Sequence, residues 1–309
     1  MNPSPDRRQL LQGAMAVGAA SLITGTSLAA EGKAVIKGRI KQSVVFWCFN
    51  VAGDKWDLDK TCQIAKDLGC VSVEIVDPKE WATLKKHGLM CAIAPNGMPG
   101  APFKTGFNNP KFHDELIERT TKTIDLCAEG GCPNVIAFNG YKFKNPDDPK
   151  SGEITREEGM ANCIKGLKQL AGHAEKKKVS ICVEHLNTRD DSHPMKGHPG
   201  YQGDDLDYVA EIIRKVGSER VRLLFDIYHV QVMHGDVIRR IEQCKDIIGH
   251  VHTAGNPGRG ELDDNQEIYY PSIMKKLLEI KYTGYVGQEF IPTKNALEGL
   301  TQAVKWCDV

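Results

Sequence analysis

Four apolar segments in the second half of the sequence each lead into a side chain that can bind a cation: Glu184, Asp226, His252 and Glu289. Three carboxylates buried together would repel one another, and each would lose its hydration. A divalent cation removes both penalties. Three carboxylates and one imidazole suit Mn²⁺, Mg²⁺, Co²⁺ or Zn²⁺ better than a soft, thiol-seeking ion. The sequence therefore predicts one divalent metal ion as the cofactor.

Taken singly, each of these residues has an ordinary structural explanation. A lone Glu or Asp at the end of a strand commonly pairs with a cation or a backbone N–H, and a lone His commonly packs in the core or lies at the surface. Four such residues at the ends of consecutive strands favour a shared site instead. His250 competes with His252, because side chains two positions apart on a strand point the same way. Periodicity alone leaves that choice open.

The elements that must position these residues alternate between short apolar strands and amphipathic helices. We expect eight strands, at residues 44–49, 71–76, 91–95, 134–139, 180–186, 221–229, 249–254 and 285–291. We expect helices between and after them, at residues 58–68, 79–87, 110–129, 156–178, 206–216, 237–244, 272–280 and 296–307.

This alternation predicts an α/β fold with a parallel sheet covered by helices. Eight such units in about 270 residues fit a closed (β/α)8 barrel, or TIM barrel, for which ~250 residues is typical. The alternative, an open doubly wound sheet, often carries a Gly-rich phosphate loop after its first strand. Residues 49–54 contain one glycine only, Gly53. In a barrel, the polar loops 96–109 and 187–203 would lie at the carboxyl ends of strands, where active sites are built.

The N-terminal segment has the pattern of an export signal. Arg7 and Arg8 precede a mildly apolar run at 13–28, and the small residues Ser27 and Ala29 mark a plausible cleavage point. This order is typical of a bacterial twin-arginine signal peptide. We therefore expect residues 1–30 to be a signal, residues 31–309 to form a single catalytic domain, and the protein to be exported to the periplasm. An uncleaved tail is the alternative.

Composition excludes several classes of protein. The 309 residues include 40 basic and 40 acidic residues, without the basic excess that is usual in general nucleic-acid binders. No run after the predicted signal approaches the ~20 apolar residues needed to cross a bilayer. None of the ten cysteines lies in a CxxC motif, so we interpret them as small core side chains. We expect the protein to bind a small-molecule substrate, and to bind neither nucleic acid nor, after removal of the signal, a membrane. Whether it forms a homo-oligomer is left open.

The segments around the candidate ligands resemble the xylose isomerase-like barrel superfamily, and within it hydroxypyruvate isomerase-like and ketose 3-epimerase-like enzymes. The motifs are VEHLN at 183–187, FDIYH at 225–229, GHVHTAGNPGR at 249–259 and GQEF at 287–290. Each is weak alone, but together they are specific for the superfamily. The resemblance implies metal ligation by Glu184, Asp226, His252 and Glu289. It favours His252 over His250 because Arg259 follows at about the family's interval.

The resemblance also implies an isomerase that moves protons on a small hydroxy-carbonyl compound such as hydroxypyruvate or tartronate semialdehyde. Such a reaction needs a base beside the carbonyl, an electrophile for the enediolate and an acid that returns the proton. We expect Glu184 and Glu289 to remove and return the proton. We expect His229, Arg259 and Glu74 to bind the substrate, with the arginine facing a carboxylate.

Other activities of the superfamily remain open. Hydroxypyruvate isomerases often carry a Gln where His252 stands, so His252 favours a ketose 3-epimerase, whereas residues 254–259 look more like the isomerases. A dehydratase (a lyase) acting on a sugar derivative is a third interpretation. An abasic-site endonuclease would need more ligands for three metal ions, and a non-enzymatic barrel would not need an intact ligand set. Export fits an extracellular sugar derivative, and so a role in carbohydrate metabolism, better than central metabolism.

Overall fold

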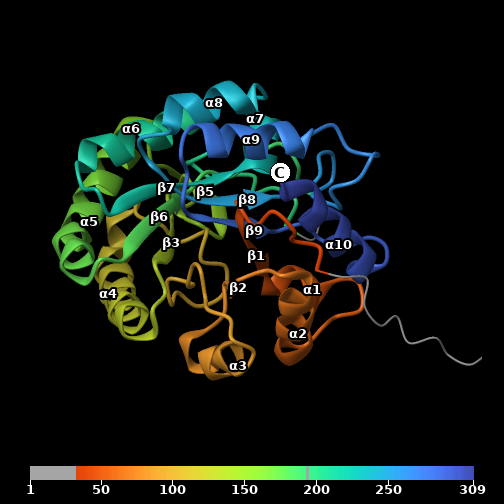
Figure 1. Cartoon of the computed structure of the whole chain (residues 1–309). Helices are drawn as coiled ribbons and strands as arrows, with labels where there is room; N and C mark the ends of the chain where they lie inside the picture. The colour runs from red at the N-terminus through yellow and green to blue at the C-terminus, as the bar shows by residue number, and fades with distance from the viewer. Residues whose placement is uncertain (1–32, 193–194) are drawn as a thin grey trace, which may run out of the picture. The chain divides into compact units, whose positions relative to one another are not determined.

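The computed structural model describes residues 33–192 and 195–309, which form a curled parallel sheet surrounded by helices (Figure 1). Residues 1–30, for which we predict an export signal, lie outside the described residues. Within the described part of the chain, no helix is both long enough and apolar enough to cross a membrane.

Among the described residues, seven strands form the main sheet, in the order β2-β1-β9-β8-β7-β6-β3. Every neighbouring pair in it is parallel. The strands are β1 (Lys41–Val45), β2 (Ser72–Glu74), β3 (Asn134–Phe138), β6 (Ser180–Glu184), β7 (Val221–Asp226), β8 (Ile248–Thr253) and β9 (Tyr285–Gln288). Their side chains are almost all buried, as the continuous apolar runs predict.

The gap between the two edge strands is closed by residues 90–94 and not by a regular strand. Met90 bridges to Ser72 of β2, and Ala94 bridges to Val135 of β3, both in the parallel sense. Pro95 follows directly and has no N–H with which to continue the ladder. The sheet therefore closes into the predicted eight-membered barrel, but the expected third strand at 91–95 is reduced to two bridges.

Helices cover the outside of the barrel (Figure 1). They are α2 (Leu58–Leu68), α3 (Trp81–Lys86), α4 (His113–Gly130), α5 (Arg156–Lys177), α6 (Leu206–Val216), α8 (Val237–Cys244), α9 (Tyr270–Glu279) and α10 (Ala296–Cys307). Helices α2, α6, α8 and α10 have the bounds that the sequence predicts. Two 3-10 turns, at Pro78–Glu80 and Pro110–Phe112, lead into α3 and α4.

Local signals set the ends of these helices. At the start of α5 the amide of Glu158 donates to Thr155 Oγ1 at 3.1 Å, and the amide of Thr155 donates to Glu158 Oε2 at 3.0 Å. This reciprocal capping box satisfies two amides that the helix leaves unpaired. Gly69 and Gly217 end α2 and α6 with positive φ, which side chains with a Cβ disfavour.

At two places a helix begins where the apolar pattern predicts strand. The expected strand at 44–49 ends at Val45, and the short helix α1 (Phe46–Val51) follows. The expected strand at 221–229 ends at Asp226. The Oδ1 atom of Asp226 accepts hydrogen bonds from the amides of Tyr228 and His229, at 2.8 and 3.2 Å, and so caps helix α7 (Ile227–Met233). Both expectations were wrong because a short apolar run does not separate a strand from a buried helix.

A two-stranded hairpin follows β3 that the sequence pattern does not predict. Strand β4 (Phe143–Asn145) pairs antiparallel with β5 (Asp148–Glu153). Most of the hairpin residues are exposed or half-buried, so the apolar runs that mark the barrel strands are missing here. The Pro146–Asp147 pair between the strands is the turn signal that could have revealed the hairpin.

Strand side chains alternate between two buried clusters. Val183 and Phe225 belong to the large cluster that packs with the helices, whereas Cys182 and Leu224 belong to a small cluster on the other face of the sheet, inside the barrel. Glu184 and Asp226 follow Cys182 and Leu224 by two positions, so their side chains also point into the barrel.

The ten cysteines are all buried and free. Burial raises the pKa of Cys70, Cys163 and Cys182 to about 12, so these thiols stay protonated at neutral pH. The prediction that the cysteines act as small core side chains is confirmed, and no disulfide links the described residues.

Candidate metal centre

The four candidate ligands meet at the carboxyl ends of β6 to β9. Glu184 ends β6, Asp226 ends β7, His252 is the penultimate residue of β8, and Glu289 directly follows β9. Asp226 and His252 are paired in register across β7 and β8. One ligand atom from each residue lies within 4.8 Å of the others. These residues, named the metal cluster below, are at most 5% exposed.

The positive charge near the metal cluster does not balance the charge of its three carboxylates. Burial, followed by repulsion from the charge of Glu289, raises the pKa of Glu184 above its ordinary value. The same two causes raise the pKa of Asp226 to about 7. Keeping both groups ionised at neutral pH therefore costs free energy that an additional cation would return.

The donor atoms fit a divalent ion. Glu184 Oε1 and Asp226 Oδ2 are buried and have no hydrogen-bond partner among the described residues. The Nδ1 atom of His252 lies 3.7 Å from Glu184 Oε1 and 2.8 Å from Glu289 Oε2. Oxygen donors with one imidazole match hard or borderline divalent ions. These residues could therefore hold the metal that the sequence predicts.

Glu289 is in a different electrostatic state from the other two carboxylates. Its Oε2 accepts from Arg259 Nη2 at 2.7 Å, and its Oε1 accepts from Trp47 Nε1 at 3.1 Å. Burial alone would raise the pKa of Glu289, but the charges of Arg259 and His252 outweigh it and hold the pKa well below its usual value. Glu289 is therefore ionised, whereas the pKa of Glu184 is shifted in the opposite direction.

His229 is held as a neutral hydrogen-bond donor beside the metal cluster. Both the backbone amide and the side-chain amide of Asn187 point at its Nδ1, at 3.1 and 2.7 Å. Burial, and then the charge of Arg259, lower the pKa of His229 well below its usual value. Because Nδ1 accepts, the proton of the neutral ring sits on Nε2, which lies 3.6 Å from Asp226 Oδ2 and has no hydrogen-bond partner.

Arg259 is a buried cation beside the metal cluster. It is 3% exposed, and its guanidinium lies 5.3 Å from the ring centre of Trp47 and 5.9 Å from that of Tyr228. Its Nη1 donates to the carbonyl of Met195 at 2.5 Å. The structure thus brings Arg259 and His229 to the metal cluster, as the sequence-based prediction requires.

Glu74 lies on the other side of His252. Its Oε1 is 2.8 Å from the Nε2 atoms of both His252 and His250. Burial alone would raise the pKa of Glu74, but His250 and then His252 lower it to about 2. The predicted contact with substrate stays a prediction, and the geometry favours support of His252.

Sequence reasoning gave no role to His198 in the loop after β6. His198 is 4% exposed, and its ring centre lies 5.9 Å from that of His229 and 4.3 Å from that of Phe103. Burial lowers the pKa of His198 to about 3, so the ring is neutral. The two polar loops therefore meet beside the site, as their place after the strands predicts. Trp47 of α1, to which the sequence pattern assigns no role, also reaches the site through its hydrogen bond to Glu289.

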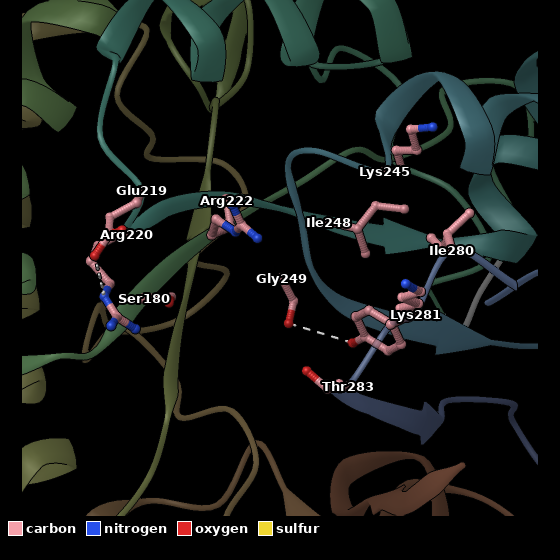
Figure 2. Close-up of a pocket in the computed structure, with 12 residues that line it drawn as sticks. Ser180, Glu219, Arg220, Arg222, Lys245, Ile248, Gly249, Ile280, Lys281 and Thr283 are labelled. Carbon is pink, nitrogen blue, oxygen red and sulfur yellow. Dashed lines mark hydrogen bonds and ion pairs between the residues drawn. The ribbon is translucent and has the colours of Figure 1, made fainter. Parts of the chain in front are cut away.

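A surface cleft of about 380 Å³ lies at the opposite, amino ends of β6 to β9 (Figure 2). Ser180 begins β6 at one wall, and Ile248 begins β8 at the other. None of its lining residues belongs to the metal cluster. The cleft is named the basic cleft below, because four cations line it: Arg220, Arg222, Lys245 and Lys281.

A barrel with acidic and imidazole donors at the carboxyl ends of its strands has the architecture of a TIM-barrel enzyme. Residues 62–308 match the family model of the xylose isomerase-like TIM barrel, and the chain belongs to this family. The motifs around the four candidate ligands lie within the matched region, so the resemblance seen in the sequence is confirmed.

Related proteins of this family are isomerases. The 2-oxo-tetronate isomerase of Cupriavidus necator is 30% identical over 248 residues, which cover 79% of this chain and 90% of that protein. The hydroxypyruvate isomerase of Escherichia coli is 30% identical over 155 residues, which cover 50% of this chain and 55% of that protein. The chain spans only 58% of the length of a human relative and 39% of that of a Drosophila melanogaster relative.

Solved structures share the fold. The 3-keto-D-glucoside 4-epimerase of E. coli superposes with a TM-score of 0.68 over 87% of this chain and 99% of that chain, at 15% identity. At this level of identity the likeness concerns the fold alone.

Proposed function

We propose that the protein is a metal-dependent isomerase that interconverts a small hydroxy-ketone and hydroxy-aldehyde bearing a carboxylate, of the type of hydroxypyruvate and tartronate semialdehyde. One observation carries the proposal: two buried glutamates in opposite electrostatic states lie in one cluster with Asp226 and His252. Pairs of titratable groups whose environments push their pKa values apart are typical of proton-transfer sites.

The two glutamates divide the proton transfer. In the metal-free site the pKa of Glu289 is lowered, which suits a group that accepts a proton, while the pKa of Glu184 is raised, which suits a group that returns one. A divalent ion bound by the metal cluster would polarise the carbonyl and hydroxyl oxygens of the substrate and hold both glutamates near them. In the reverse direction the two glutamates exchange these roles.

The reaction needs no reagent besides proton exchange with solvent, which returns the two glutamates to their starting protonation states after each turnover. For hydroxypyruvate, one glutamate takes a proton from C3, and the other delivers a proton to C2. The hydroxyl proton of the C3 oxygen is lost, and the C2 oxygen gains one, which gives tartronate semialdehyde. His229, neutral and with an unpartnered Nε2, can donate to a substrate oxygen during this exchange.

Arg259 supports a substrate that carries a negative charge. Its guanidinium is buried beside the metal cluster, where a carboxylate could accept two parallel hydrogen bonds from it. The relatives named for 2-oxo-tetronate and hydroxypyruvate act, by those names, on such acids. A neutral ketose brings no carboxylate, so the charge of Arg259 would then be balanced only by carboxylates of the protein.

A ketose 3-epimerase is the second candidate, because His252 stands where hydroxypyruvate isomerases often carry a Gln. The same two glutamates would then remove and return a proton at one carbon from opposite faces. A dehydratase acting on a sugar derivative would instead eliminate water, so its product differs in mass. The product therefore separates the three activities.

The test is an assay in D₂O with hydroxypyruvate, 2-oxo-tetronates and a panel of ketoses, with and without a chelator. We expect chelator-sensitive isomerisation of the acids with deuterium at the exchanged carbon, lost in Glu184→Gln and Glu289→Gln. Glu158→Gln, a carboxylate in the cap of α5, is the matched control and keeps full activity. Turnover that is indifferent to the chelator, or turnover of ketoses alone, contradicts the proposal.

We also propose that residues 1–30 direct export to the periplasm. The support is the order of Arg7-Arg8, a mild apolar run and small residues. A reporter fused after residue 30 should reach the periplasm, and changing both arginines to lysine should retain it in the cytoplasm. Equal localisation of the two fusions would overturn this part of the proposal.

A further inference from the structure

Two histidines of β8 share one buried carboxylate oxygen. The Nε2 atoms of His250 and His252 each lie 2.8 Å from Glu74 Oε1, and all three residues are 0% exposed. An ionised carboxylate only accepts hydrogen bonds, so each ring must direct an N–H at it. Both histidines therefore carry a proton on Nε2.

A proton on Nε2 determines what the other nitrogen of His252 can do. The Nδ1 atom of His252 faces Glu184 Oε1 at 3.7 Å and Glu289 Oε2 at 2.8 Å. When Nε2 is the donor, Nδ1 is the nitrogen that can give its lone pair to an ion. Glu74 thus selects the edge of the ring that faces the metal cluster.

His250 holds Glu74 in place without reaching the metal cluster. Its ring lies at 88° to that of His252, with the ring centres 5.0 Å apart, and its Nδ1 has no hydrogen-bond partner. Two donors on the same oxygen fix the carboxylate from two directions. Without His250, the buried Glu74 would be held by His252 alone.

The neighbouring strand leaves the space that this contact needs. Gly287 of β9 is paired in register with His252. A Cβ at Gly287 would lie 2.2 Å from Glu74 Oε1 and 2.9 Å from His252 Cδ2. The φ angle of Gly287 is not in the left-handed region, so this position needs a glycine for space and not for backbone conformation.

We propose that Glu74, His250 and Gly287 form a positioning unit that fixes the ring orientation and tautomer of His252 for metal binding. This inference rests on the proposed function, because it takes His252 as a metal ligand. Glu74 is then a positioning residue and does not contact the substrate.

The rival explanation is a second ion held by Glu74, His250 and His252, whose ligand atoms also lie within 4.8 Å of one another. An ion there would need both Nε2 atoms without protons. Separations of 2.8 Å from each Nε2 to one oxygen are hydrogen-bond distances. Donor atoms of one ion can lie equally close, but this group offers three donors with one carboxylate, whereas the metal cluster offers four donors with three carboxylates. The number of ions bound per chain decides between the two explanations.

The first test titrates Mn²⁺ into the metal-free full chain by calorimetry. Wild type should bind one ion, and Glu74→Gln and Gly287→Ala should each bind it about 10–100-fold more weakly, the usual cost of losing an outer partner of a metal-bound histidine. Gln42→Met is the matched control. It removes a buried amide that bonds to Gln288 and Val304, so it should lower stability and leave Mn²⁺ affinity unchanged.

The outcomes separate this inference from the proposed function. If wild type binds no Mn²⁺, the proposed function fails. If wild type binds one ion and Glu74→Gln binds it equally well, the positioning unit is overturned. Two ions per chain would replace it with the second site.

A second measurement does not depend on the variants folding. In the Zn²⁺-loaded wild type with ¹⁵N-labelled histidine, NMR should show protonated Nε2 on both His250 and His252, with the Nδ1 of His252 bound to the metal. An unprotonated Nε2 on His252 would overturn the proposal.

Discussion

The two ends of strands β6 to β9 both gather charged side chains, but in opposite environments. At the carboxyl ends the metal cluster is at most 5% exposed and contains three carboxylates around one histidine. At the amino ends the cations of the basic cleft line an open hollow (Figure 2). Lys245 and Lys281 are exposed, and Arg220 and Arg222 are half-buried.

Burial, more than the number of charges, distinguishes the metal cluster from the basic cleft. In the basic cleft, Lys245 pairs with Glu242 at 2.5 Å, and Arg222 donates to the carbonyl of Asp246 at 2.9 Å. Charged groups that keep contact with solvent stay hydrated and cost little. In the metal cluster, the pKa of Asp226 rises to about 7, while that of Glu289 falls well below its usual value. Substitutions at the two ends should therefore differ greatly in effect.

The largest effect is expected for Glu289→Gln at the carboxyl end. Removing a proton-transfer group should lower kcat by ~10²–10⁴-fold. The fold should persist, because the change also removes a charge that repels Glu184 and Asp226. Steady-state kinetics and circular dichroism check this. A variant that keeps more than a tenth of the activity would exclude Glu289 from proton transfer.

Next in size is Arg259→Ala. Loss of a charge-assisted hydrogen bond worth ~1.5–3 kcal/mol should lower kcat/KM for a carboxylate substrate about 10–100-fold. Activity on a neutral substrate should fall less, because that substrate loses only the support that Arg259 gives to Glu289 and no contact with its own carboxylate. Equal losses on acids and neutral ketoses would show that Arg259 supports Glu289 and does not recognise the substrate.

Metal affinity should depend on pH. Burial alone would lower the pKa of His252, but the charges and hydrogen bonds of Glu289, Glu184 and Glu74 raise it well above its usual value. Below this raised pKa the metal-free ring is protonated, so an ion must displace at least one proton. Affinity for Mn²⁺ should therefore rise at least tenfold per pH unit between about pH 5 and 7. Calorimetry in buffers of different ionisation enthalpy measures how many protons are released when Mn²⁺ binds. Release of no proton would contradict this prediction.

A smaller effect concerns the stability of the metal-free chain. The pKa of Asp226 is raised to about 7 in the folded state, above ~3.9 in the unfolded chain. Its protonation thus favours the fold below about pH 4, and this contribution is lost as pH rises through 7. Asp226→Asn can still accept the α7 cap bonds, so it should match wild type at pH 4 and melt several degrees higher at pH 8. Identical pH profiles of Tm would argue against a strained carboxylate.

The smallest effect is expected for Arg222→Ala in the basic cleft. The variant loses one hydrogen bond to the carbonyl of Asp246 and no contact with the metal cluster. Its kcat and metal affinity should match wild type within twofold, with at most a small change in Tm. A loss of activity comparable to that of Arg259→Ala would break the contrast between the two ends.

The carboxyl ends were the more predictable part of the molecule. Glu184, Asp226 and Glu289 could be named because each interrupts an apolar run, and a polar residue at the end of a buried strand needs an explanation. The barrel followed from the alternation of strands and helices. The predicted strand at 221–229 runs into the first turn of α7, because Ile227 and Tyr228 continue the apolar run and only the cap by Asp226 marks the start of the helix.

Contacts between distant strands could not be read from the pattern. Glu74 and His250 are separated by 176 positions in the chain and lie on β2 and β8, which are not hydrogen-bonded neighbours in the sheet. Their contact depends on the closure of the barrel and on which side chains point inward. His198 was equally hidden, because a polar loop gives no periodic signal that separates a buried histidine from a solvated one.

We propose that the buried charges at the carboxyl ends of β6 to β9 form a binding site for one divalent ion. The most direct test is a calorimetric titration of Mn²⁺ into the metal-free protein, with Asp226→Asn and Arg222→Ala alongside. We predict one ion per chain for wild type and Arg222→Ala, and a large loss of affinity for Asp226→Asn. Absence of binding in wild type, or unchanged binding in Asp226→Asn, would show that these residues do not form the metal site.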